Sequence, residues 1–559
     1  MIVRGLPPPG FAAPVVIVGA GPAGIVLALE LRRRGVAAVM LAGGGDGFGP
    51  AFQALADAEI ADPRRHAPMA LAVRRGLGGT SLLWGGRCVA YDDIDFAARP
   101  HVPESAWPVG HAEIAPWYVP AAAYLDAGEP TFAAPLPHLK PTAECRFDRL
   151  ERWSGRRNLR RAHAAALERD PGLCVCLGPV ATGLRIDPAS GHVAGIELDM
   201  PDGRHAVLSA RAVALACGGL ETTRLLLVAQ AAQPRLFGGP DGALGRYYMG
   251  HIEGRIADIV FERAGADREF DFFVDGGGRY VRRRITIAAE AQRRHRLLNL
   301  CAWPDNPPLG DPGHGDALLS LAYLSLAMPG LGRALAPEAI RRKHLDGGAE
   351  AVGAHLGNIL AGAPRAAREA ARWLYRHYLA RPRLPGFFIL NRAHRYSLFF
   401  HAEHAPNRDS TVRLAPSRDA LGMPRLRIDL RFAEIDARSV VAAHRVIEGG
   451  LREAGLGRLD YAVAEPEREA AVLNQATDGY HQIGTARMSA DPAAGVVDRD
   501  CRVHGTANLF VASSAIFPSS SQANPTLLLA AFSARLAAHL AQRWRELPES
   551  AVPCGEPAA

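Results

Sequence analysis

The chain has 559 residues, of which 48% are hydrophobic and 22% are charged, and its formal net charge is +7. These values exclude wholesale disorder and a fibrous architecture, and the length predicts more than one globular domain. Only Lys140 and Lys343 are lysines among the 64 basic residues. Because the arginines are interspersed with acidic residues and not gathered with aromatic ones, the basic balance does not indicate a nucleic-acid partner.

The N-terminus and the eight cysteines bear on the compartment. No apolar segment precedes a signal cleavage site, and the cysteines do not form a disulfide framework. The close pair Cys174 and Cys176 lies in an apparent strand, which predicts both thiols on one face, without zinc-site spacing. We therefore expect reduced thiols and a cytoplasmic protein. The proline-rich residues 7–14 and 548–557 are expected to be frayed, which leaves a folded body from Val15 to Trp544.

The folded body begins with a βαβ pattern. Residues 15–18 form a short apolar run, a helical pattern extends through residue 34, and residues 36–41 form a second apolar run. Between the first strand and the helix, Gly19 permits a tight turn and Gly21 lets the backbone approach a pyrophosphate. Gly24 allows the helix to pack closely on the strand, and the helix N-terminus offers free amides to an anion. This context predicts a dinucleotide site.

One part of the dinucleotide pattern is missing. An Asp or Glu usually follows the second strand and binds the ribose hydroxyls, but this position falls at Ala42. Asp46 lies nearby, beyond three further glycines, and its reach to a ribose is left open.

A second glycine-rich segment covers residues 78–87, with the sequence GGTSLLWGGR. It is too long and too apolar for an ordinary hairpin turn. Its glycines bring backbone amides close to a ligand, and Thr80 and Ser81 add hydroxyl groups. A flat or closely packed ligand is therefore expected to lie against it.

The middle of the chain, residues 257–474, mixes strand-like pieces such as 410–414 and 426–430 with helical ones, which predicts a separate α+β domain. Residues 317–332 are interrupted by a proline and are too short to span a membrane, so we expect a buried segment. Residues 364–379 predict a solvated helix with an arginine stripe opposite an apolar side. A lid, a partner-docking face and a membrane-surface helix are alternatives for it.

Several histidines of this region receive structural interpretations. His251 is expected to be structural. His401 and His404 flank Glu403 on an apparent strand, where their rings point to opposite faces, so no metal is expected there.

The C-terminal part carries two further motifs. Tyr480-His481-Gln-Ile-Gly-Thr-Ala-Arg-Met comes first. The segment Ala523-Asn524-Pro525-Thr526 then opens an apolar helix that extends to about residue 540. A single histidine is more often structural than catalytic, but this setting favours a catalytic role for His481.

Four segments together resemble the glucose-methanol-choline (GMC) oxidoreductases, in particular the pyranose oxidase and sugar or polyol dehydrogenase branch. They are the βαβ start (the head), the second glycine-rich segment, the segment 216–226 and the two C-terminal motifs (the tail). The resemblance covers nearly the whole chain and is weakest from residue 257 to 400. It implies an α/β fold like that of p-hydroxybenzoate hydroxylase, with a Rossmann-like FAD-binding domain and an inserted α+β substrate domain. The FAD-binding domain is expected at 14–256, including the loop 78–95, and again at 475–545, with the substrate domain at 257–474.

The resemblance also implies the site residues. FAD is expected to contact Gly19, Gly21, Gly24, Gly79, Thr80, Ser81, Trp84, Gly85, Val180, Ser513, Ser514, Pro525 and Thr526. His481 and Asn524 match the family's catalytic pair beside the flavin. A neutral imidazole can take the proton of an alcohol while hydride passes to flavin N5, and Asn524 can hold the same oxygen.

Some members of the family attach FAD to a histidine directly before the tryptophan of the second loop. Leu83 occupies that place here, so we expect non-covalent FAD. The resemblance implies oxidation of a CH–OH group of a sugar, cyclitol or polyol. The alternatives are a non-redox flavoprotein with lyase-like chemistry, a binding or scaffold protein with weakened FAD binding, and, more remotely, a nicotinamide enzyme. An electron-acceptor protein or a second copy of the chain could be a partner, and no transmembrane segment is expected.

Overall fold

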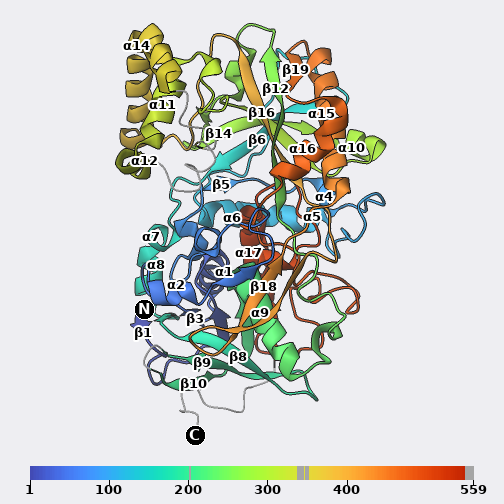
Figure 1. Cartoon of the computed structure of the whole chain (residues 1–559). Helices are drawn as coiled ribbons and strands as arrows, with labels where there is room; N and C mark the ends of the chain where they lie inside the picture. The colour runs from blue at the N-terminus through green and yellow to red at the C-terminus, as the bar shows by residue number, and fades with distance from the viewer. Residues whose placement is uncertain (201–202, 336–344, 346–351, 548–559) are drawn as a thin grey trace.

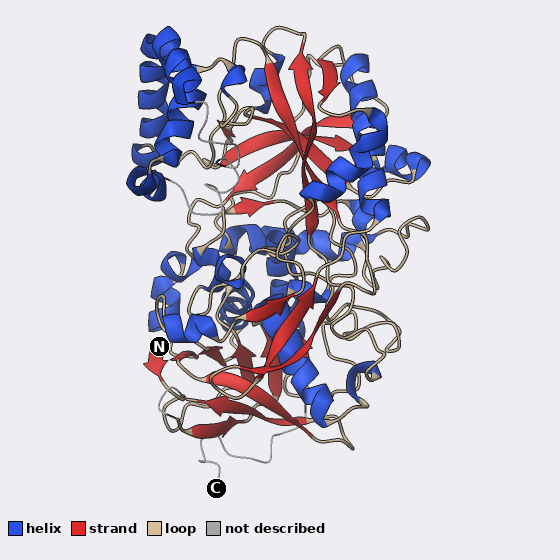
Figure 2. Ribbon diagram, viewed as in Figure 1, coloured by secondary structure: helices blue, strands red, loops and turns tan. Residues whose placement is uncertain are grey.

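A computed structural model describes the chain except for residues 201–202, 336–344, 346–351 and 548–559. Figure 1 shows two halves stacked on one another, and the N-terminus lies in the lower half. The lower half contains a parallel sheet, and the upper half contains an antiparallel sheet with helices on both sides, as Figure 2 shows.

The lower half is built on a six-stranded parallel sheet in the order β1-β7-β3-β2-β11-β20. Its inner strands are apolar and buried, as expected for a sheet that is covered on both faces. The first and last parts of the chain meet in it, because β11 pairs with β2 on one side and with β20 on the other. The Rossmann-like prediction is confirmed. The strands are β1 Ile2–Arg4, β2 Val15–Val18, β3 Ala38–Ala42, β7 Leu173–Leu177, β11 Ala212–Leu215 and β20 Leu509–Val511.

The prediction that the folded body begins at Val15 was wrong. Strand β1 pairs in parallel with β7, so that Ile2 lies opposite Val175, and the terminal amine of Met1 donates a hydrogen bond to the carbonyl of Leu173. A short strand can join a sheet edge through its backbone alone, without the longer apolar pattern by which strands are recognised. Residues 548–557, also expected to be frayed, lie outside the described residues.

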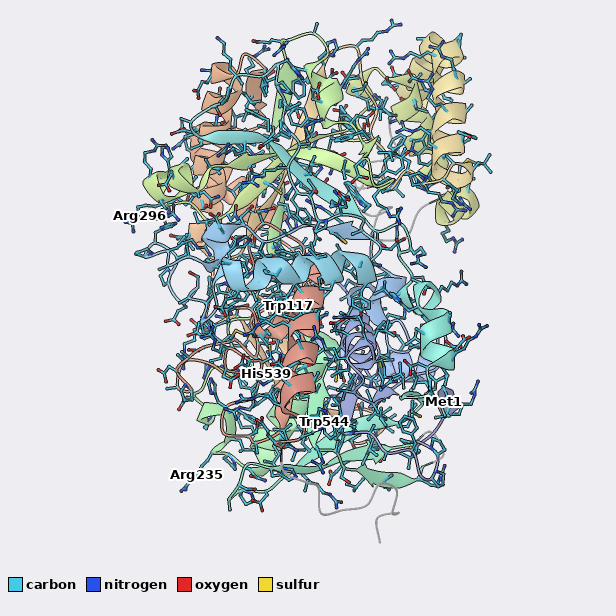
Figure 3. All side chains as sticks on the ribbon, turned by 180° about the vertical axis from the view of Figure 1, so that it is seen from behind. Met1, Trp117, Arg235, Arg296, His539 and Trp544 are labelled. Atoms are coloured by element: carbon cyan, nitrogen blue, oxygen red, sulfur yellow. The ribbon has the colours of Figure 1, made fainter. Side chains whose placement is uncertain are left out.

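Three long helices cover the parallel sheet. Helix α1 (Pro22–Arg33) begins directly after the first glycine turn, and it packs against α17 (Thr526–Arg543), which is buried along most of its length. Figure 3 shows α17 from behind, with His539 on the helix and Trp544 at its end. Helix α9 (Gly218–Ala232) follows β11. Shorter helices are α2 Pro50–Ala54, α3 Met69–Ala72, α4 Asp93–Phe96, α5 His111–Ile114, α6 Tyr118–Tyr124, α7 Leu159–Ala162 and α8 Ala164–Arg169.

The upper half is built on an eight-stranded antiparallel sheet in the order β19-β12-β16-β15-β14-β6-β5, with β13 paired to β14. Helices α10 (Ala289–His295), α15 (Glu434–Glu453) and α16 (Arg468–Gln475) lie on one side of it in Figure 1. The strands are β5 Arg87–Cys88, β6 Cys145–Trp153, β12 His251–Phe261, β13 Phe273–Val274, β14 Tyr280–Ile287, β15 Leu300–Asp305, β16 Arg395–Glu403 and β19 Gly457–Tyr461.

The predicted domain boundaries at residues 256 and 474 do not coincide with the division of the strands between the sheets. Strands β5 and β6 come early in the chain but lie in the antiparallel sheet. Strands β17 (Thr411–Arg418) and β18 (Pro424–Asp429), which we expected in the middle domain, form a small sheet with β4 (Ala58–Ile60). A further sheet of the lower half contains β8 Val180–Ile186, β9 Val193–Asp199 and β10 His205–Leu208.

Residues 317–332 form α11 (Ala317–Ala327) and the beginning of α12 (Pro329–Leu335), and α11 buries side chains such as Leu319 and Tyr323. In the described part of the chain, no helix is long and apolar enough to cross a membrane. The predicted helix 364–379 belongs to α14 (Val352–Leu374) and the turn that follows it. Its apolar side is exposed, including Leu374 at 44%, because the helix buries the narrow side that carries His355 and Ala366.

Candidate active site

His481 lies in a loop that a buried carboxylate organises. Asp478 accepts hydrogen bonds from the backbone N–H groups of His251 (2.6 Å), Tyr480 (2.8 Å) and His481 (3.2 Å). It also accepts one from Nδ1 of the His481 ring at 3.1 Å. Burial alone would raise the pKa of Asp478, but the neighbouring His481 and His251 hold this pKa well below its usual range. Asp478 is therefore an anion that fixes the loop and the ring together.

This network also assigns the tautomer of His481. A carboxylate can only accept hydrogen bonds, so Nδ1 carries the proton and Nε2 keeps its lone pair. The amide nitrogen of Asn524 lies 2.8 Å from that Nε2 and donates to it. The structure therefore brings the two predicted catalytic residues together, with the basic nitrogen of His481 directed at Asn524.

Two more imidazoles complete the cluster. His251 donates from Nε2 to the carbonyl of Ser520 at 3.2 Å, and its Nδ1 lies 3.0 Å from Nδ1 of His481. The ring of His401 stacks on that of His251 at 4.2 Å, and Nδ1 of His401 donates to the carbonyl of Gln522 at 2.8 Å. Burial lowers the pKa of His251 to about 4 and the pKa of His401 well below its usual value. Both rings are therefore neutral near pH 7.

The sequence predicted a structural role for His251, and opposite sheet faces for the rings of His401 and His404. His404 has different surroundings, because its ring stacks on Phe432 at 4.5 Å. Ligand nitrogens of His251, His401 and His481 lie within 4.8 Å of one another. The strand periodicity of His401 and His404 could not reveal this cluster, because its members come from three distant segments.

Asn524 sits just before α17, which begins at Thr526 after Pro525, as predicted. Its amide oxygen Oδ1 is buried and has no hydrogen-bond partner among the described residues. A buried, unpaired acceptor is costly, and active sites are a common place for one. Asn524 thus offers an unused oxygen next to the basic nitrogen of His481.

The loop of His481 is connected to the parallel-sheet half through the next residue, Gln482. Its side-chain oxygen accepts from the backbone of Leu220 near the start of α9 at 3.2 Å, and its carbonyl accepts from the hydroxyl of Ser514 at 2.7 Å. A Cβ added at Gly219 would lie 2.6 Å from Cβ of Gln482, so only glycine fits there without a shift.

A cavity opens at the carboxyl ends of the parallel strands, where α/β sheets usually bind their ligands. Five of the predicted FAD contacts line it, namely Gly19, Gly21, Gly79, Thr80 and Ser513. A Cβ at Gly21 would meet nothing closer than 3.9 Å, whereas a Cβ at Gly24 would lie 2.0 Å from the carbonyl oxygen of Gly19. Gly21 therefore leaves room for a ligand, and Gly24 serves the packing of α1 on the turn.

The other predicted contacts do not line this cavity. Ser81 donates to the carbonyl of Gly78 at 2.6 Å, and Trp84 donates to the carbonyl of Arg157 at 2.7 Å. Val180 is buried between two residues that do line the cavity, Pro179 and Ala181. The lining also does not include Gly85, Ser514, Pro525, Thr526 or the pair His481 and Asn524.

The expected place of the ribose has polar groups that the sequence pattern did not reveal. Ala42 lines the cavity together with Arg75 and Glu221, whose side chains form an ion pair at 2.8 Å. Asp46 does not line it and is held by Arg160 at 2.6 and 2.8 Å. Neither Arg75 nor Glu221 lies at the position where the dinucleotide pattern expects an acid. Spacing alone therefore could not identify them.

Comparisons with known proteins bear on the two ends of the chain. A family model described as GMC oxidoreductase matches residues 406–533, and one described as FAD binding domain matches residues 12–43. A C-glycoside 3-oxidase from Arthrobacter globiformis is 32% identical over 135 residues, which are 24% of this chain and 23% of the relative. The fructose dehydrogenase large subunit from Gluconobacter japonicus is 28% identical over 146 residues, 26% of this chain and 25% of the relative. The matched segments thus span about a quarter of each curated relative.

Solved structures share the fold over nearly the full length. Pyridoxine 4-oxidase from Mesorbium loti superposes with a TM-score of 0.52 and 17% identity, covering 94% of this chain and 99% of that one. A fungal aryl-alcohol oxidase superposes with a TM-score of 0.54 and 14% identity, covering 96% and 100%. At these identities the likeness shows the fold.

Proposed function

We propose that this chain, a member of the GMC oxidoreductase family, is an FAD-dependent enzyme that oxidises an alcohol group of a sugar, cyclitol or polyol to a carbonyl. The contact between His481 and Asn524 beside the buried anion Asp478 carries this proposal. The sugar class is supported by the printed names of two relatives, C-glycoside 3-oxidase and fructose dehydrogenase large subunit.

The residues at the strand ends fit FAD. Gly21 leaves its backbone open toward the cavity, and the first turn of α1 directs free amides there, as a pyrophosphate requires. Glu221 can accept hydrogen bonds from ribose hydroxyls while Arg75 holds its side chain. Leu83 offers no nucleophile in the second loop, so we propose non-covalent attachment. FAD released by denaturant would agree with this, and a flavin that stays on the denatured chain would contradict it.

When bound, FAD supplies the hydride acceptor. In the proposed reaction, Nε2 of His481 takes the proton of the substrate hydroxyl, which makes the carbinol carbon a better hydride donor. Asp478 accepts from Nδ1 throughout and stabilises the imidazolium that forms. Asn524 can turn from His481 to the substrate and hold its oxygen, and the N-terminus of α17 favours negative charge nearby.

Anaerobic flavin bleaching tests the proposal. A panel of sugars, cyclitols and polyols is added to the purified yellow protein, and we expect at least one compound to bleach the flavin absorbance. His481→Ala should slow bleaching about 10²-fold or more, whereas His205→Gln, at an exposed histidine of β10, should not. A flavin that no alcohol reduces would favour the lyase-like alternative, and a colourless protein that takes up no FAD would favour a binding protein.

The electron acceptor is tested with the same panel. Turnover with an artificial dye but not with oxygen would indicate a dehydrogenase, and equal turnover with oxygen would indicate an oxidase.

A further inference from the structure

A basic cavity of about 500 Å³ lies beside the second glycine-rich loop. Its lining comes from segments 153–157, 279–280 and 377–385, which lie at the end of β6, at the start of β14 and after α14. Its charged lining residues are Arg157, Arg279, Arg381 and Arg383, and no carboxylate is among the described residues that line it. Arg157 and Arg279 are half-buried, and Arg381 and Arg383 are exposed. A cavity lined by charges of one sign attracts an oppositely charged ligand.

One nearby acid is already engaged. Asp126 receives hydrogen bonds from Arg279 at 2.5 Å and from Arg156 at 3.3 Å. It therefore neutralises Arg279 and leaves Arg157, Arg381 and Arg383 without an acidic partner among the described residues.

Arg157 is the best-fixed cation of the three. Its stem packs on the second loop, because a Cβ added at Gly86 would lie 2.9 Å from Cγ of Arg157. Its backbone carbonyl accepts a hydrogen bond from the Trp84 side chain at 2.7 Å. Three residues earlier, the backbone N–H of Ser154 donates to the carbonyl of Gly86 at 2.8 Å. Burial lowers the pKa of Arg157, and no acidic residue offsets that effect. The guanidinium is thus partly desolvated before any ligand arrives.

His377 adds a second unsatisfied group. Its ring stacks on Trp373 at 4.6 Å, and its Nδ1 is buried without a hydrogen-bond partner. Burial lowers the pKa of His377, a hydrogen bond with the backbone of Leu384 opposes this effect, and the charges of Arg157 and Arg383 lower the pKa further. Arg157, His377 and Arg383 line the same cavity from different segments of the chain.

The remaining wall is aromatic. Trp153 and Tyr280 line the cavity and are 8% and 6% exposed. A guanidinium binds carboxylate and phosphate groups through a planar pair of N–H donors, and aromatic walls favour a ring or another apolar body.

We propose that this cavity is a binding site for a small organic anion, whose carboxylate or phosphate group is held by Arg157 and Arg383 and whose ring lies against Trp153 and Tyr280. The site is distinct from the cavity at the strand ends and does not depend on the proposed oxidation. Arg157 contacts Trp84 and Gly86 of the second loop, so an occupant held by Arg157 would stiffen that loop.

Calorimetric titration of the FAD-loaded protein tests the proposal with three probes, namely inorganic phosphate, phenyl phosphate and benzoate. We expect saturable 1:1 binding of at least one ring-bearing anion, tighter than inorganic phosphate, and weaker at high salt. Phenyl phosphate and benzoate distinguish a phosphate from a carboxylate as the bound group.

Arg157→Gln should weaken the binding at least tenfold, and Arg383→Gln should weaken it as well. The matched control is Arg156→Gln, which changes the neighbouring arginine that pairs with Asp126 and does not line the cavity. Equal melting temperatures establish that the variants fold. The absence of saturable binding up to 10 mM, taken as roughly the weakest affinity of interest, or an equal loss in Arg156→Gln, would overturn the proposal. Neither result depends on whether an alcohol reduces the flavin.

Discussion

At the scale of single residues, Asp478 is expected to fix the tautomer and orientation of His481, because it accepts a hydrogen bond from Nδ1 of that ring. Asp478→Asn removes the negative charge and no longer enforces the tautomer with a free Nε2. We expect anaerobic flavin reduction by an active alcohol to slow about 10²-fold.

The affinity for FAD separates this role from a structural one. Asp478 does not line the strand-end cavity, so Asp478→Asn should bind FAD with an unchanged Kd. A variant that loses FAD together with the rate would show that Asp478 only supports the loop.

Glu221 is expected to take the role of the acidic residue that is missing at position 42, where the chain has Ala42. Glu221→Gln removes the anionic acceptor at the cavity and should weaken FAD binding to the apoprotein about tenfold. Ala42→Glu should not tighten FAD binding, because Glu221 and Arg75 already provide polar groups at this place. Fluorescence titration of the apoprotein with FAD measures both. A tighter Ala42→Glu variant together with an unaffected Glu221→Gln variant would mean that the ribose has no acidic partner in the natural chain.

At the scale of elements, the turn between β2 and α1 contains two glycines with separable roles. A Cβ at Gly24 would overlap the carbonyl of Gly19, so Gly24→Ala should destabilise the fold by about 1–3 kcal/mol. A Cβ at Gly21 meets only ordinary contacts, so Gly21→Ala should leave the melting temperature of the apoprotein unchanged and weaken FAD binding. Thermal unfolding of the apoproteins and FAD titration give the two quantities. Equal melting temperatures of the two variants would contradict this division.

Elements set by local sequence were predictable. The apolar run of β2, the glycines before α1 and the proline before α17 each determine their own structure. Elements set by distant partners were not. Strand β1 exists because β7 offers it an edge, and the buried side of α14 is chosen by its neighbours in the fold rather than by its arginine spacing.

The residues of the candidate site also divide into those that sequence motifs reveal and those whose role depends on the fold. His481 and Asn524 stand in motifs that the sequence displays, and the structure places them 2.8 Å apart. Asp478 precedes His481 by three residues, but its role depends on how the loop folds back on itself. The basic cavity joins residues near 155 and near 380, and no spacing rule connects those segments.

At the scale of the whole molecule, the two ends of the chain lie in one sheet, and the strand-end cavity is lined by Gly19 from the head and Ser513 from the tail. A ligand there must therefore stabilise both ends together. We expect FAD at about 100 times its Kd to stabilise the apoprotein by about 2.7 kcal/mol. Amide hydrogen exchange should slow in α1 and at the start of α17 over the same FAD concentrations, whereas the exposed helix α14 should change little. Gly21→Ala serves as the control and should show both effects only at higher FAD concentrations, because its affinity for FAD is weaker. Protection confined to α1 would mean that the tail does not share the cofactor, and the proposed hydride transfer beside His481 would lose its basis.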